Sequence, residues 1–273
     1  MSSIRAIGPY PCPPYLIRRK PRRELAGAVV DVVGYRENGR ALAGQVEMAA
    51  LIVPLIISFG APFNIALGRQ PGPTDVFASF TSGLFAGHVV IDSPGAAECI
   101  QIDFTPIGAC RFFGVPMSEL AGRMVTLDEL GDRDISRLRQ QLWQEQNWDA
   151  RLDLAEAFVL DRLQQSEPAD PAVLWAFDQI LAAKGNLSIA RLADRLDWSR
   201  KHLAHLFHAK LGLAPKAIAR MIRFHNAVET ARAEAGTDWA DIAAACGYAD
   251  QAHLTREFVE FSGTTPQRWR MAA

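Results

Sequence analysis

The sequence predicts an α+β fold, in which an N-terminal β-rich sandwich or barrel-like domain with flanking helices precedes an all-α domain. Short stretches with strand-like alternation, bounded by Gly and Pro, fill residues 25–113. Beyond them, apolar residues recur mainly at helical spacing. A chain of 273 residues is long enough for two domains. The two prolines of the segment 166–171 indicate the boundary, so we expect domains at 1–165 and 172–273.

The expected strands begin at residues 28–35, a valine-rich stretch followed by an Asn-Gly turn. Residues 49–68 carry no charge over a length that would span a membrane. Because Pro54 and Pro62 interrupt this segment, we interpret it as two buried strands around a turn. At residues 100–104, Ile and Phe alternate with Gln101 and Asp103, which is the pattern of a half-buried strand.

The expected helices start with a short helical turn at 118–123 and two amphipathic helices at 134–143 and 152–163. The apolar faces of these two helices either pair with a second copy of the chain or cover their own sheet. Pro171 is suited to the first turn of a further helix that ends near Gly185.

Two similar helix pairs follow, each with the plan of a helix-turn-helix unit. The first has Ser188 as its expected N-cap, a break at 197–199 and a second helix with apolar residues at 203, 206 and 207. The other has Asp238 as its cap, a break at 247–250 and apolar residues at 254, 258 and 261.

The turns and the connection between the units support this plan. A tight turn needs a left-handed backbone, which Gly247 adopts freely and Asp197 at a modest cost. Residues 215–235 predict one long helix, which at ~1.5 Å per residue spans roughly 30 Å. This is close to one turn of B-DNA, about 34 Å, so the two units would fit successive major-groove segments on one face of a duplex.

Four motifs closely resemble the C-terminal domain of AraC/XylS-type bacterial transcription regulators. They are residues 212–224 (GLAPKAIARMIRF), 241–248 (DIAAACGY), 251–258 (QAHLTREF) and 263–269 (GTTPQRW). The resemblance covers about residues 172–270 and implies seven helices with two helix-turn-helix units that bind double-stranded DNA. The chain departs from the family at Asp197, where Gly is usual.

The resemblance and the helical periodicity together assign roles on the second helix of each unit. An exposed Lys or Arg is usually a solvated charge, so these assignments depend on the motifs. Arg256 is suited to bidentate pairing with guanine and Gln251 with adenine. The expected base-reading residues are Lys201, His205, Gln251, Thr255 and Arg256. The expected phosphate contacts are Ser199, Arg200 and His253.

The N-terminal half gives fewer signals. Residues 100–123 resemble a sensor domain of some AraC-type regulators, which implies binding of a ligand or partner but names none. Two alternatives stay open: a thiol-based redox sensor using Cys99 and Cys110, both expected on strands, or a small-molecule enzyme activity. Groups available for catalysis are Cys99, Cys110, His88, Asp92 and Asp103. Because no catalytic motif such as a nucleophile elbow or a P-loop occurs, we do not expect an enzyme.

Composition sets the remaining expectations. The net charge of −1 neither favours nor excludes nucleic acid. The four cysteines, at 12, 99, 110 and 246, show no metal-ligand spacing, and residues 1–14 lack the apolar core of a signal peptide. We therefore expect a reduced, cytoplasmic regulator without metal, cofactor or membrane association. Its expected partners are double-stranded DNA, a small-molecule effector, a second copy of the chain and, for an activator, RNA polymerase.

Overall fold

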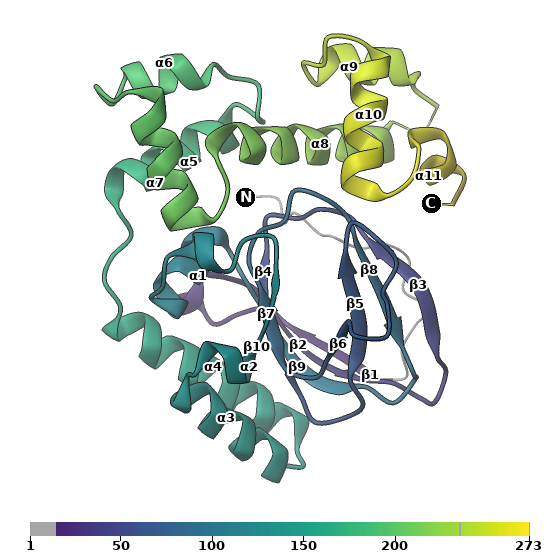
Figure 1. Ribbon diagram of the computed structural model, residues 1–273, viewed down its shortest axis with the longest axis vertical. Helices are drawn as coiled ribbons and strands as arrows, with labels where there is room; N and C mark the ends of the chain where they lie inside the picture. Colours follow the sequence, from purple (N-terminus) through teal and green to yellow (C-terminus); the bar gives the residue numbers. More distant parts are fainter. Residues whose placement is uncertain (1–14, 235, 273) are drawn as a thin grey trace.

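The computed structural model describes residues 15–234 and 236–272, and it has a β-rich N-terminal part and a helical C-terminal part (Figure 1). The N-terminal part contains two antiparallel sheets. The larger has the order β1 (Tyr15–Arg19), β2 (Val29–Arg36), β9 (Glu98–Phe104), β4 (Val53–Ser58), β7 (Phe80–Ser82) and β10 (Met124–Thr126). The smaller has the order β3 (Leu42–Glu47), β8 (Val89–Ser93), β5 (Phe63–Leu67) and β6 (Val76–Phe77).

The uncharged segment 49–68 forms two strands around a turn, as predicted. Its strands β4 and β5 lie in different sheets, so the turn carries the chain from one sheet to the other. Short strands β6 and β7 repeat this crossing in the next segment. These crossings place the two sheets face to face with a space between them.

Strand β9 is central to the larger sheet, paired with β2 on one side and β4 on the other. Ile100, Ile102 and Phe104 are fully buried on one face. The prediction of a half-buried strand is wrong for the other face, because Asp103 there is only 8% exposed. The smaller sheet covers that face, so its polar residues line an internal cavity instead of meeting bulk solvent.

Helices cover the outer side of the larger sheet. Helix α4 (Trp148–Gln165) contacts β2 and β9, and α3 (Arg133–Gln144) packs against α4. These helices therefore cover their own sheet, which was one of the two alternatives. Within this part are also α1 (Pro106–Phe113), α2 (Leu127–Leu130) and the short 3-10 helices η1 (Arg23–Leu25) and η2 (Met117–Glu119).

Cys110 lies on α1, so its predicted position on a strand is wrong. Three local features make this segment helical. Thr105 caps its N-terminus by accepting a hydrogen bond from the backbone N–H of Gly108, Pro106 occupies the first turn, and Gly114 ends it with φ 65°. These capping signals outweigh the strand-like composition that surrounds them.

The C-terminal part contains the seven helices that the resemblance implies. They are α5 (Pro171–Ala182), α6 (Ile189–Asp194), α7 (Arg200–Leu211), α8 (Pro215–Ala233), α9 (Trp239–Ala245), α10 (Gln251–Ser262) and α11 (Pro266–Ala272). The predicted caps are confirmed, since Ser188 and Asp238 each accept a backbone hydrogen bond at the start of α6 and α9. Asp197 and Gly247 both adopt the left-handed backbone that the turns need, with φ 56° and 75°.

Candidate functional site

Helix α7 is the second helix of the first helix-turn-helix unit. Its N-terminus is fixed by Ser199, whose hydroxyl accepts a hydrogen bond from the backbone N–H of His202 at 3.1 Å. Leu203 and Phe207 are fully buried and hold the helix to its own unit. The predicted base readers Lys201 and His205 are exposed, as is Arg200, which we predicted to contact phosphate.

Helix α10 has the same design in the second unit. Asp250 caps it by accepting a hydrogen bond from the backbone N–H of His253 at 2.6 Å. Leu254 and Phe258 are fully buried. The remaining predicted readers lie on the other faces, with Gln251 and Arg256 exposed and Thr255 partly exposed.

His253 differs from the other predicted DNA contacts because its ring is already engaged. Its Nδ1 accepts a hydrogen bond from the Ala249 backbone N–H at 3.4 Å, and its Nε2 lies 3.3 Å from Glu257 Oε1. The ring also packs edge-on against Tyr248. A phosphate contact by His253 stays a prediction, and it would compete with these interactions.

Glu257 links the second recognition helix to the long helix α8. Its carboxylate accepts hydrogen bonds from Arg220 Nε at 2.7 Å and from Arg223 Nη2 at 3.0 Å. Burial alone would raise the pKa of Glu257, but the two guanidinium groups outweigh it and hold this pKa below its usual value. The ionised carboxylate therefore fixes the orientation of α10 on α8.

The two recognition helices lie at opposite ends of α8 (Figure 1). With 19 residues, α8 is about 28 Å long at ~1.5 Å per residue. Both helices expose their N-terminal ends, which carry most of the predicted readers. The length of α8 is a little less than one turn of B-DNA, about 34 Å.

The C-terminal ends of both recognition helices are docked on the N-terminal part. At the end of α7, Gly212 lies so close to Met117 and Ala121, in and just after η2, that an added Cβ would meet both at 3.1 Å. At the end of α10, the Phe261 carbonyl accepts a hydrogen bond from the Ala49 backbone N–H at 2.8 Å. Beside it, the Glu260 carbonyl accepts one from the backbone N–H of His88 at 3.3 Å. The N-terminal part therefore contacts both units.

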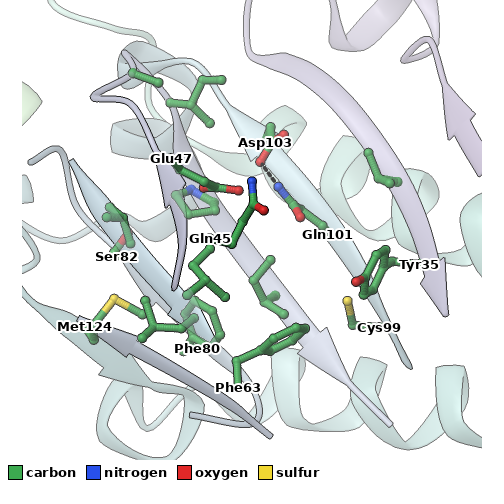
Figure 2. A pocket seen from close by; sticks show the side chains of 18 of the residues that line it. Tyr35, Gln45, Glu47, Phe63, Phe80, Ser82, Cys99, Gln101, Asp103 and Met124 are labelled. Carbon is green, nitrogen blue, oxygen red and sulfur yellow. Dashed lines mark hydrogen bonds between the residues drawn. The ribbon is translucent and has the colours of Figure 1, made fainter. Parts of the chain in front are cut away.

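A cavity of about 230 Å³ lies between the two sheets. Figure 2 shows its apolar end at Phe63, Phe80 and Met124, and its polar end where Gln45, Glu47, Gln101 and Asp103 converge. Residues 47–50, which precede β4 and include Ala49 at the junction with α10, also line it. Sequence analysis missed this site. The available signal was a pair of polar residues two positions apart on each of two strands, Gln45 with Glu47 and Gln101 with Asp103. This spacing places the two members of each pair on the same face of their strand.

The groups considered for catalysis or redox chemistry lie in different surroundings, although Cys99 and Asp103 both line the cavity. Burial raises the pKa of the Cys99 thiol, and burial also raises that of Cys110, against the opposing charge of Lys210. Asp92 accepts a hydrogen bond from the Gly44 backbone N–H, and His88 lies at the junction with α10. Cys12 lies outside the described residues. Within residues 15–234 and 236–272, no cluster of three or more His, Cys, Asp and Glu has the arrangement of a metal site.

Comparison with known proteins gives one family match, covering residues 192–272, to a helix-turn-helix domain. This part of the chain is an AraC-type helix-turn-helix domain. It includes the second helix pair, the first pair from residue 192 onward, and most of the segment that carried the resemblance. The chain thus contains the DNA-binding domain of a transcription regulator.

Three similar solved structures are of ToxT from Vibrio cholerae. ToxT from strain O395 has 8% identity and a TM-score of 0.45, over 85% of this chain and 95% of that chain. A second crystal form has 9% identity and a TM-score of 0.45, over 88% and 98%. Wild-type ToxT with a bound unsaturated fatty acid has 9% identity and a TM-score of 0.41, over 93% and 97%. At these values the likeness assigns no role to any residue here.

No curated protein matches the chain. Among the helices in the described part of the chain, none is long and apolar enough to cross a membrane.

Proposed function

We propose that the chain is a sequence-specific transcription regulator in which α7 and α10 read two adjacent major-groove segments, under the control of an effector-sensing N-terminal part. One observation carries the proposal. Both recognition helices expose their polar N-terminal ends, while both are docked at their C-terminal ends on the part that contains the cavity. DNA reading and its control would thus use opposite ends of the same two helices.

Base preference would come from side chains of different chemistry at the two sites. Arg256 would donate to guanine O6 and N7, and Gln251 would pair with adenine, with Thr255 beside them. Lys201 and His205 would supply donors in the other segment. Ser199, Arg200 and His253 would contact phosphates, which position the protein without reading sequence.

Control would pass through residues 47–50, which line the cavity and contact the DNA-binding domain. His225 of α8 is buried where its imidazole meets the backbone of Ala49, so this segment touches α8 as well as α10. A ligand that binds more tightly when residues 47–50 are in one conformation than in another would shift the population of the DNA-competent state. A homodimer and a contact with RNA polymerase stay predictions.

The proposal is tested by selecting binding sites from a randomised DNA library with the full chain, at two salt concentrations. We expect a bipartite site with segments about 10 base pairs apart. Arg256→Ala should relax base preference in one segment only, and Lys201→Ala in the other. Affinity should fall with salt for every variant, because phosphate contacts release counterions.

Arg139→Ala is the matched control for loss of an exposed arginine. Arg139 lies on α3, at the far end of the molecule from α10 (Figure 1). It should leave the selected site unchanged. A site with a single contiguous segment, or equal effects of the Arg139 and Arg256 substitutions, would contradict two-segment reading.

A further inference from the structure

The connection between α5 and α6 is held in one conformation by its own backbone. Lys184 and Gly185 are both left-handed, with φ 50° and 75°. The backbone N–H of Gly185 donates to the Ile180 carbonyl at 2.9 Å. The backbone N–H of Asn186 donates to the Ala183 carbonyl at 2.8 Å. This turn ends α5 and leads directly into the first helix-turn-helix unit, so its position is tied to that of the unit.

The same connection packs closely on the backbone of α8. A Cβ added to Gly185 would meet the Ala219 carbonyl oxygen at 2.1 Å and the Arg223 backbone nitrogen at 2.9 Å. These distances leave no room for a side chain at position 185, which favours Gly there as the left-handed backbone does. Gly185 therefore fixes the start of the first unit at one place along α8.

The turn of the second unit reaches the same place on α8. Arg223 donates from Nη2 to both carboxylate oxygens of Glu257, at 3.0 and 3.2 Å. Its guanidinium also lies 4.7 Å from the centre of the Tyr248 ring. Tyr248 directly follows Gly247, the left-handed residue of that turn. Arg223 thus lies beside the first unit's connection through its backbone and binds the second unit through its side chain.

The two units also meet directly, at Asn186 and Gly247. A Cβ added to Gly247 would lie 2.5 Å from Nδ2, 2.7 Å from Cγ and 2.9 Å from Oδ1 of Asn186. The amide of Asn186 therefore occupies the space that a side chain at position 247 would need. This contact joins the connection before α6 to the turn before α10 without passing through α8.

We propose that Asn186 is a positioning residue, which holds the two helix-turn-helix units in one relative orientation through Gly247 and so fixes the spacing of the two DNA segments. This rests on the proposed reading of two segments by α7 and α10. A helix of 19 residues such as α8 can curve, so α8 alone would let the recognition helices tilt relative to each other. One base pair adds about 3.4 Å and about a tenth of a turn, so a small tilt changes the spacing that both helices can reach.

The test separates spacing from base preference. The bipartite site selected by the full chain is shortened or lengthened by one base pair between its segments, and affinities are measured by fluorescence anisotropy. The unmodified chain should lose about tenfold or more with either change, which is comparable with one mismatched base pair. Asn186→Ala should lose about threefold or less, because its units can follow the shifted segment. Its base preference within each segment should stay unchanged, whereas a general loss of folded protein would weaken binding equally at every spacing.

Gln179→Ala is the matched control for loss of an amide. Gln179 Oε1 accepts a hydrogen bond from Arg195 Nη1 at 3.1 Å, a contact between α5 and the first unit only. This variant should keep the spacing penalty of the unmodified chain. Urea unfolding adds a test without DNA. Gly247→Ala should destabilise the chain less in the Asn186→Ala background, because the two substitutions act on one contact.

Equal spacing penalties for the unmodified chain and Asn186→Ala, an equally relaxed penalty for Gln179→Ala, or additive losses in urea would each overturn the positioning role. If the library selection yields a bipartite site and the penalties are equal, only this inference is wrong. If the selection yields no bipartite site, the proposed two-segment reading is wrong, and the urea comparison still decides whether Asn186 joins the two units.

Discussion

Replacing Glu257 with Gln tests whether α10 is held in place by a buried charge. Glu257 is 4% exposed, and its Oε1 lies within 3.3 Å of nitrogens of Arg220, Arg223 and His253. Removing one member of a buried ion pair costs about 3–5 kcal/mol. The two arginine side chains are 27% and 16% exposed and regain some hydration. We therefore expect Glu257→Gln to lower the free energy of unfolding by about 2–3 kcal/mol.

Glu260→Gln is the matched control. It makes the same chemical change one helical turn away and removes a carboxylate that also pairs with Arg220. Its side chain is 44% exposed, and exposed ion pairs contribute about 0–1 kcal/mol. Urea unfolding followed by tryptophan fluorescence measures both variants, since Trp239 and Trp269 pack beside Phe258 on α10. Equal losses for the two variants would refute a special role of the buried charge.

The same comparison has a predicted pH dependence. Because the pKa of Glu257 is lowered in the folded protein, its charge stabilises the fold at pH values above the unfolded pKa of roughly 4.3. This contribution is lost as the pH falls through that value toward the lower folded pKa. The difference in stability between the unmodified chain and Glu257→Gln should therefore shrink in acid. A difference that stays constant from pH 7 to pH 3 would show that the charge is not its source.

Further substitutions test the turns, the sheet cover and the thiols. Asp197→Gly should raise thermal stability by about 1 kcal/mol, because φ 56° strains a residue with a Cβ, whereas Gly247→Ala, at φ 75°, should lower it. Arg151→Ala should cost about 3–5 kcal/mol in urea unfolding, since its buried guanidinium contacts a β9 carboxylate and two backbone carbonyls. Cys99 and Cys110 should react with iodoacetamide at pH 8 more slowly in the native than in the unfolded chain, and oxidant should leave DNA affinity unchanged. Fast labelling of the native chain, or a DNA affinity that changes with oxidant, would support the redox-sensor alternative.

Local chemistry explains why the helical part was predictable. Ser188 and Asp238 cap their helices through bonds that need only nearby backbone, and the left-handed turns at Asp197 and Gly247 are likewise local. The apolar positions at helical spacing, such as Leu203 and Phe258, are buried because one face of each helix meets its own unit. Each of these signals lies within a few residues of its consequence.

The β-rich part was less predictable because its outcome depends on distant residues. Alternation in β9 correctly marks Ile100 and Ile102 as core, but it cannot tell solvent from a cavity on the opposite face. Asp103 becomes buried only because the smaller sheet, from separate segments of the chain, covers that face. The junction between the two parts has no local sequence signal, because its hydrogen bond joins Ala49 to Phe261, more than two hundred positions further along the chain.

The contacts of the junction give the proposed control a route from the cavity to two distant helices. The junction contacts α10 through Ala49, which lines the cavity. It also contacts α10 through His88, which lies between the lining residues Gly87 and Val89. The junction contacts α7 through η2 and the residues just after it. In this segment the Leu120 carbonyl accepts a hydrogen bond from the backbone N–H of Gly83, which lines the cavity. Under the proposal, an occupant would meet the support of α10 directly at Ala49 and that of α7 through Gly83. Because α8 joins the two helices, a change in either support would alter how they are presented to DNA, and this is what the proposed bipartite site would sense.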